Sequence, residues 1–155
     1  MTMTMRFEPV IEALPPAFDD LRLEATAEGY RFIERLATDW QAGTMRFIGE
    51  GEKLLCAFVD NIPAGLGGLT LDPDLPGAMR MRRFYVRRPF RQRGIGRRLV
   101  DHLLESPRRM NKIIVVHAGD GSAGFWEALG FTPDPYDGHS HILHPPTMID
   151  RSAER

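Results

Sequence analysis

Hydrophobic and polar residues alternate along the first third of the chain with a helical period. They place one apolar face on a helix from about Ala17 to Ala27 and another on a helix from Tyr30 to Trp40, which ends near Gly43. A short extended stretch from Arg6 to Ile11 precedes them and could form a first strand. The pattern therefore predicts a strand followed by two helices with a short connection.

The middle of the chain changes to compact apolar runs. Residues Lys53 to Val59 and Ala64 to Leu71 flank the turn-prone Asp60-Asn61-Ile62-Pro63, which is the spacing of an antiparallel hairpin. Glycines 65, 67 and 68 weaken the second strand. They indicate a bulge, a close approach by another group or a poorly formed edge strand.

Beyond residue 80 the pattern alternates between strand and helix. A strand is expected from Met81 to Val86, a helix from Ile95 to Leu104 and a buried strand from Lys112 to His117. Because a helix connects the two strands, they are most simply parallel. The remaining expectations are a short helix around Phe125 to Leu129, a loop from Pro133 to Gly138, a final strand from His139 to His144 and a tail from Pro145.

A chain of 155 residues with 43% hydrophobic and 26% charged content can bury one core. We expect one domain over residues 1–155, with its core at about 5–144 and a polar tail at 145–155. The single cysteine, Cys56, lies in an apolar run and is expected to be a buried structural thiol. The sequence shows neither a signal peptide nor eighteen uninterrupted apolar residues, so we expect a cytoplasmic protein without a membrane partner.

A glycine turn with arginines joins the strand at 81–86 to the helix that follows it. It reads Arg91-Gln92-Arg93-Gly94-Ile95-Gly96, and no acidic residue occurs between Asp74 and Asp101. Two glycines at a helix start let a ligand approach the backbone, and the free first-turn N–H groups attract an anion. The turn lacks the lysine of a P-loop and the third glycine of a dinucleotide fold, so we predict a different pyrophosphate site. The alternative is a tight turn on a solvated basic surface.

This turn resembles the Arg/Gln-x-x-Gly-x-Gly/Ala signature of the GNAT N-acetyltransferases. The segment from Ser122 to Phe131, which ends in Leu-Gly-Phe, resembles the second acetyl-CoA segment of that family, and Asp60 to Gly65 resembles its hairpin. The resemblance covers roughly residues 52 to 144. It assigns acetyl-CoA binding to Phe84, Tyr85, Val86, Arg91, Gln92, Arg93, Gly94, Ile95, Gly96, Arg97, Phe125 and Trp126.

The resemblance also implies a fold. It is an α/β (α+β) fold with a central, mixed but mostly antiparallel twisted sheet of six or seven strands, flanked by about four helices. In that family the strands expected here at 81–86 and 112–117 splay apart, so that the pantetheine arm inserts between them. The two N-terminal helices and their connection form one wall of the acceptor pocket, which makes Glu24, Glu28, Tyr30 and Phe32 candidate contacts.

The chemistry of acetyl transfer is only partly visible in the sequence. Backbone N–H groups at 84–86 would polarise the thioester carbonyl. Trp126 stands where the family has a phenol, and an indole N–H cannot act as a titrating acid. Tyr85 and Glu24 are the catalytic candidates, and a water relay to Glu28, Asp72 or a histidine is an alternative. Tyr136 is a further, weaker candidate for the acid.

Arg82 and Arg83 stand where many family members have a carboxylate. Strand alternation would put them on opposite faces, so only one would face the acceptor pocket. Together with Glu28 and Tyr30 they are the predicted acceptor contacts. An arginine there favours an amine that also carries an acidic group, whereas pairing of both arginines with Asp72 or Asp74 is the structural alternative.

The leading function is therefore acetyl-CoA-dependent transfer to a primary amine of a small molecule or peptide, by direct attack. One alternative is an acyl-CoA sensor with weakened catalysis, and nucleic-acid binding through the arginine run ranks last. The histidines near 139–144 complete no recognised metal site, so no metal is expected. Dimers are common in this family, and a homodimer stays open.

Overall fold

One seven-stranded sheet organises the chain. The computed structural model describes residues 4–119, 121–136 and 138–145, and its strands follow the order β1-β2-β3-β4-β5-β7-β6. All neighbours are antiparallel except β4 and β5, which are parallel. The strands are β1 (Met5–Pro9), β2 (Lys53–Val59), β3 (Ile62–Leu71), β4 (Ala78–Val86), β5 (Ile113–Val116), β6 (Thr132–Tyr136) and β7 (His139–Leu143).

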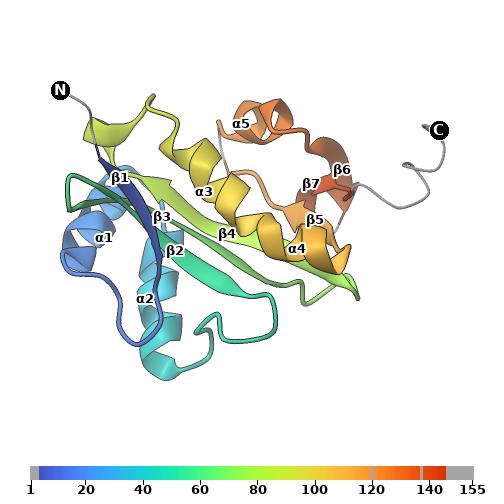
Figure 1. The fold of residues 1–155 in the computed structure, drawn as a ribbon, viewed down its shortest axis with the longest axis horizontal. Helices are drawn as coiled ribbons and strands as arrows, with labels where there is room; N and C mark the ends of the chain where they lie inside the picture. Colours follow the sequence, from blue (N-terminus) through green and yellow to red (C-terminus); the bar gives the residue numbers. More distant parts are fainter. Residues whose placement is uncertain (1–3, 120, 137, 146–155) are drawn as a thin grey trace.

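Helices cover both faces of this sheet. In Figure 1, α1 and α2 lie on one side, and α3, α4 and α5 lie on the other. The helices are α1 (Phe18–Ala27), α2 (Phe32–Ala42), η1 (Arg88–Phe90), α3 (Ile95–Leu103), α4 (Glu105–Met110) and α5 (Ala123–Ala128). This arrangement confirms the predicted fold class.

The two faces bury two separate hydrophobic cores, as expected for helices packed on both sides of a sheet. Leu21 of α1 and Leu36 of α2 pack against Leu66 and Tyr85. On the opposite face, Leu99 of α3 belongs to the second core. Cys56 is buried in the α1/α2 core, where desolvation raises the pKa of its thiol to about 12, so it is a structural thiol as expected.

Two elements differ from the sequence predictions. Residues 133–136 were expected to be a loop, but they lie in β6, the edge strand paired with β7. The prolines are tolerated because an edge strand does not need every N–H in the ladder. The second is α4, a helix that was not expected from the sequence; Pro107 stands in its first turn, where a missing N–H costs little.

The three glycines of β3 make close approaches possible. A Cβ at Gly65 would lie 2.8 Å from the Tyr85 carbonyl oxygen, at Gly67 2.7 Å from the Phe84 ring, and at Gly68 2.6 Å from the Phe47 ring. β3 lies between β2 and β4, so the edge-strand alternative is wrong. The glycines let β3 face a crowded, bulged neighbour.

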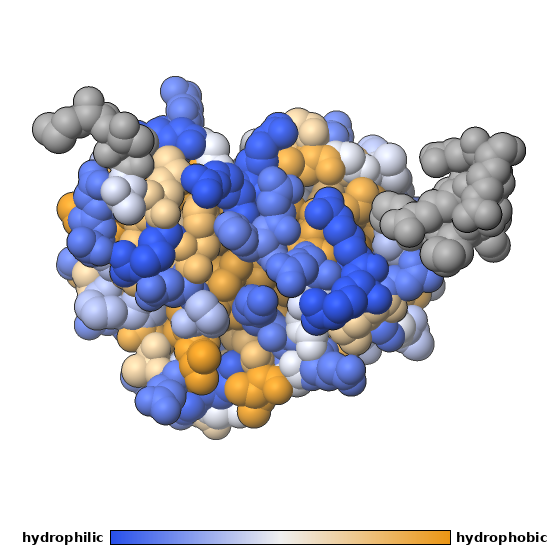
Figure 2. All heavy atoms as spheres, viewed as in Figure 1, coloured by the Kyte–Doolittle hydropathy of each residue, from blue (hydrophilic) through white to orange (hydrophobic). Residues whose placement is uncertain are grey.

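The outer surface is mixed in character. On the face drawn in Figure 2, hydrophilic residues cover most of the area and hydrophobic residues form patches between them. In the described part of the chain, none of the helices combines the length and the apolar character needed to cross a membrane.

Candidate acetyl-CoA and acceptor site

A notch in the sheet is the central feature of the site. β4 and β5 pair only from Ala78↔Ile113 to Met81↔Val116, after which β5 ends while β4 continues to Val86. The β5-facing side of β4 therefore has no strand partner over its last five residues. A cavity of about 850 Å³ opens there.

A β-bulge shapes the wall of the notch. Leu66 of β3 opposes Tyr85, but Gly68 opposes Arg82, so β4 has one extra residue in this stretch. Arg83 has a φ of 64°, a left-handed conformation that is uncommon for a residue with a side chain. The bulge breaks the alternation of the strand at this point.

The bulge also corrects the prediction that Arg82 and Arg83 face opposite sides. Arg83 Nη2 donates to Asp39 Oδ2 of α2 at 3.2 Å, and Arg82 Nη1 contacts Met45 Sδ at 3.9 Å just beyond α2. Both side chains thus reach the α2 side of the sheet, and both line the cavity. Regular alternation could not predict this, because it assumes an unbroken strand.

The glycine turn for which a pyrophosphate site is predicted, residues 91–96, lies at the beginning of α3. We call it the cradle. Gly94 is the N-cap residue with a φ of 78°, no side chain caps the helix, and an added Cβ on Gly94 would meet open space. Its first-turn N–H groups are free for an anion among the described contacts. Gly96 lies against Phe125, because a Cβ on Gly96 would be 3.1 Å from the Phe125 ring.

Three aromatic residues form the wall of the cavity on the α5 side. Phe84 and Trp126 meet edge to face at 5.1 Å between ring centroids, and Phe125 and Trp126 do so at 5.0 Å. Trp126 is buried against the α3 core, whereas Phe125 is partly exposed. The rings give the cavity an apolar side that suits the pantetheine chain of an acyl-CoA.

Glu28, at the end of α1, is held by an ion cluster. Its carboxylate accepts hydrogen bonds from Arg91 at 2.8 and 2.7 Å, from Arg88 at 3.0 Å and from the Tyr85 hydroxyl at 2.5 Å. The Arg91 hydrogen bonds are the main cause that lowers the pKa of Glu28 from 4.5 to about 2. Burial, and then the bond to Glu28, raises the pKa of Tyr85.

This cluster changes the roles of three predicted residues. Glu28 is absent from the cavity lining and is a poor base, because Arg91 and Arg88 neutralise it. The Tyr85 phenol lines the cavity, but its hydroxyl donates a hydrogen bond to Glu28, so it is not free to protonate a leaving group. The guanidinium of Arg91 donates hydrogen bonds to Glu28 and to the Val86 carbonyl oxygen, 2.8 Å away. These donors are therefore not available to a phosphate.

Glu24, the other catalytic candidate, lies away from the cavity. Its carboxylate accepts a hydrogen bond from Arg87 Nε at 2.9 Å, and Arg87 also donates to the Pro63 carbonyl oxygen at 2.9 Å. Glu24 therefore joins α1 to the end of the β2–β3 hairpin. It is not among the residues that line the cavity.

The other predicted residues divide between the cavity and its rim. The predicted residues that line the cavity are Tyr30, Phe32, Arg82, Arg83, Phe84, Tyr85, Val86, Arg91, Gly96, Phe125 and Trp126. Gln92, Arg93, Gly94, Ile95 and Arg97 belong to the turn or to the first turn of α3, outside that lining. Within this group Ile95 is buried in the core, while Arg97 is exposed.

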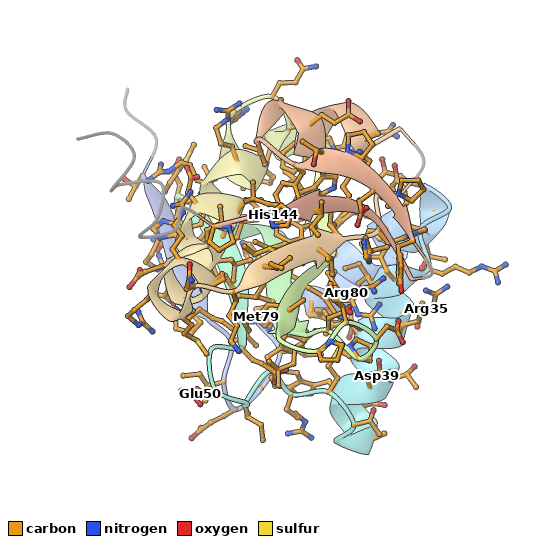
Figure 3. The ribbon with its side chains drawn as sticks, turned by 90° about the vertical axis from the view of Figure 1, so that its right-hand side faces the viewer. Arg35, Asp39, Glu50, Met79, Arg80 and His144 are labelled. Atoms are coloured by element: carbon orange, nitrogen blue, oxygen red, sulfur yellow. The ribbon has the colours of Figure 1, made fainter. Side chains whose placement is uncertain are left out.

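Sequence reasoning missed several residues of the cavity. His117 follows directly after β5 and is exposed at the notch, Ser122 precedes α5, and Arg35 comes from α2. Figure 3 shows Arg35 and Asp39 of α2 on the same side of β4 as Arg80, with Met79 directed to the other side. A polar residue directly after a buried strand was the available signal for His117.

Two of the other histidines are engaged with carboxylates outside the cavity. His139 Nε2 lies 2.8 Å from Asp134 Oδ2, and His141 Nε2 lies 2.8 Å from Glu127 Oε2. Within residues 4–119, 121–136 and 138–145, no group of three His, Cys, Asp or Glu side chains could hold a metal ion.

The site fits an acyl-CoA in three respects. The cradle at Gly94 has room and free donors for the pyrophosphate, the unpaired edge of β4 offers backbone groups to an extended chain, and the aromatic wall is apolar.

Comparison with known proteins agrees with this geometry. The model of the acetyltransferase (GNAT) family matches residues 14–131. An uncharacterized N-acetyltransferase of Bacillus cereus (strain B4264) is 37% identical over 62 residues, a segment that spans 39% of this chain and only 37% of that relative.

Solved structures of low sequence identity share the fold. A putative acetyltransferase from Exiguobacterium sp. 255-15 has a TM-score of 0.81 with 21% identity, over 100% of this chain and 99% of that one. Arabidopsis thaliana Naa50, in complex with the bisubstrate analogue CoA-Ac-MVNAL, has a TM-score of 0.61 with 19% identity, over 92% and 99%. Bacillus subtilis YlbP, an N-acetyltransferase in complex with coenzyme A, has 0.58 with 15% identity, over 92% and 97%.

These findings confirm the predicted acetyltransferase class, for which acetyl-CoA is the cosubstrate. The family model covers most of the chain, including the notch, the glycine turn and the aromatic wall. The chain therefore belongs to the GNAT family of acetyltransferases.

Proposed function

We propose that this protein transfers the acetyl group of acetyl-CoA directly to a primary amine. The observation that carries the proposal is the notch, where the unpaired edge of β4 meets the glycine turn of α3 in one cavity. The bisubstrate analogue bound by the Arabidopsis protein supports direct transfer, because such a molecule places both substrates in one site.

The chain contributes positioning and polarisation to this reaction. Bound acetyl-CoA supplies an activated thioester. Backbone N–H groups along the unpaired edge of β4 are preorganised donors for a carbonyl oxygen, and the apolar wall of Phe84 and Trp126 excludes water from that side. Alignment of two reactants in one cavity can supply about 7–11 kcal/mol of the barrier.

We assign the proton acceptor to His117. It is exposed at the end of β5 and lines the cavity, and an imidazole nitrogen can accept the proton that the attacking amine loses. The other candidates are less suitable because their polar groups are already bound. Arg91 binds Glu28, and Arg87 binds Glu24. The Tyr85 hydroxyl is bound to Glu28.

Two measurements test the function. Calorimetry with acetyl-CoA should show one binding site per chain, and a panel of primary amines should then release free thiol from acetyl-CoA. Failure to bind acetyl-CoA would contradict the proposal. Binding without thiol release for any amine would instead support the alternative of an acyl-CoA sensor.

A further inference from the structure

Four arginines, Arg35, Arg80, Arg82 and Arg83, line the cavity, and two of them have no ion pair among the described residues. Arg80 lies 3.3 Å from Asp72, and Arg83 lies 3.2 Å from Asp39. Among the described residues, the one polar contact of Arg82 is with the Met45 sulfur, and Arg35 is exposed. Neither arginine has a described carboxylate within ion-pair distance. The acceptor side of the cavity therefore presents guanidinium groups that the described residues do not neutralise.

Buried donors without partners strengthen this observation. The Nε atoms of Arg82 and Arg83 are buried and have no hydrogen-bond partner among the described residues, and the same holds for the hydroxyl of Thr70. Arg82 and Thr70 also line a second, smaller pocket of about 390 Å³ beside the first. Buried polar groups are normally satisfied, so the guanidinium groups of Arg82 and Arg83 are short of hydrogen-bond partners where they line the cavity.

The local charge points to an anion. Burial, together with the positive charges of Arg80 and Arg83, lowers the pKa of Arg82 to about 10, although Asp72 and Asp39 act in the opposite direction. Asp74 is the one described carboxylate in the cavity lining, and its side chain lies against Gly138. An incoming carboxylate would stabilise the charged form of Arg82, whereas a second cation would not.

The position of Arg82 links this anion site to the reaction. Arg82 follows Met81, the last residue of β4 that pairs with β5, so it stands at the mouth of the notch. The bulge at Arg83 keeps both guanidinium groups on the α2 side, opposite the aromatic wall. An acceptor bound there could place its amine at the notch and its acidic group on the arginines.

We infer that the acceptor is an amine that also carries a carboxylate, held by Arg82 with Arg83 and Arg35 beside it. The inference rests on the proposed acetyl transfer. A guanidinium binds a planar carboxylate through two parallel hydrogen bonds, and the same positive charge disfavours polyamines. The arginines have a second effect, because nearby positive charge lowers the pKa of the acceptor ammonium and favours the reactive neutral amine.

The experiment compares acceptors that differ only in charge. Alanine, β-alanine and glutamate are each assayed against the corresponding carboxamide, with spermidine as a cationic acceptor, in the wild type and in Arg82→Met, Arg82→Lys and Arg109→Gln. Arg109 is a matched control because it is exposed on α4, where it pairs with Glu105. Calorimetry with the N-acetylated products and their carboxamides, in the presence of coenzyme A, gives a readout independent of turnover.

The wild type and Arg109→Gln should prefer at least one carboxylate acceptor over its amide by about tenfold or more in kcat/KM, and Arg82→Met should lose that preference. Arg82→Lys should keep part of it, because the charge stays while the two-pronged geometry is lost. The affinity for acetyl-CoA should be unchanged in all variants.

A preference for amides or for spermidine, or an unchanged preference in Arg82→Met, would overturn the inference and leave the proposed function standing. Absence of transfer to every amine, together with tighter binding of the acidic products than of their amides, would support the anion site and contradict the proposed function. Absence of both would overturn the inference.

Discussion

Arg91 donates two hydrogen bonds to the carboxylate of Glu28, from Nη1 to Oε1 at 2.8 Å and from Nη2 to Oε2 at 2.7 Å. Its Nε donates at the same time to the carbonyl oxygen of Val86. One guanidinium thus connects the end of α1 to the end of β4, at the first residue of the glycine turn. The arginine of the signature motif acts here as a structural clamp.

The clamp predicts a pH-dependent stability. A carboxylate whose pKa is depressed by folding stabilises the protein above its unfolded pKa, and this stabilisation is lost as the pH falls through the folded value. Glu28→Gln should lower the free energy of unfolding by about 2 kcal/mol near neutral pH. The difference from the wild type should shrink between pH 4.5 and about 2, measured by denaturant unfolding at each pH.

Glu105→Gln is the control for this experiment. Glu105 forms an exposed ion pair with Arg109 at 3.6 Å, so its loss should change stability by less than about 0.5 kcal/mol at any pH. A gap between wild type and Glu28→Gln that stays constant down to pH 2 would argue against the clamp.

A side chain at Gly94 of the glycine turn should prevent acetyl-CoA binding, beyond any effect of backbone strain at that residue. Gly94→Val should cost about 1–2 kcal/mol of stability because of its left-handed φ, and it should abolish acetyl-CoA binding because a side chain would stand before the cradle. Gly77→Val is the matched control, since Gly77 has a φ of 79°, open space around it and no place in the cavity lining. Equal acetyl-CoA affinity of the two folded variants, measured by calorimetry, would refute the cradle.

The arginines of α3 predict a small, salt-dependent contribution to binding. Arg97 is exposed in the first turn of α3, whereas the guanidinium of Arg98 lies over the Phe7 ring at 4.9 Å. Arg97→Ala should weaken acetyl-CoA binding about threefold at low salt and less at high salt, because exposed charges are screened. Arg98→Ala should leave the affinity unchanged. A dissociation constant of the wild type that does not vary with salt would show that backbone groups alone bind the phosphates.

His117 predicts a defect in turnover without a defect in binding. His117→Ala should lower kcat about 100-fold or more, while acetyl-CoA affinity stays the same. His144→Ala is a suitable control, because His144 is exposed and does not line the cavity. Equal rates for the two variants would exclude His117 as the proton acceptor.

The elements that could be predicted from the sequence are those that depend on a local pattern of hydrophobic residues. Hydrophobic spacing identified α1, α2 and α3, the β2–β3 hairpin and the buried β5, and the motif identified the family. The sequence could not predict β6, because Pro133 and Pro135 are typical of a loop unless the strand lies at an edge. The position of a strand within the sheet is a property of the whole chain.

The site was less predictable for the same reason. Glu28 is separated in sequence by 63 residues from Arg91 and by 57 from Tyr85. No local sequence pattern could therefore predict the hydrogen bonds that join these three residues. The bulge at Arg83 is likewise invisible in Met-Arg-Arg-Phe-Tyr, which reads as a regular strand. In the partner strand, Gly67 and Gly68 leave room for the rings of Phe84 and Phe47, which side chains at these positions would exclude.

The short seam between β4 and β5 has a consequence for the motions of the sheet. Four residue pairs join the block β1–β4 to the block β5–β7–β6, so backbone ladders couple the two blocks only weakly. A ligand chain that forms hydrogen bonds with the open edge of β4 would replace the absent β4–β5 backbone hydrogen bonds and would connect the two blocks. Amide hydrogen exchange in β7 and β6 should therefore slow when acetyl-CoA binds, although these strands lie outside the cavity's unpaired edge.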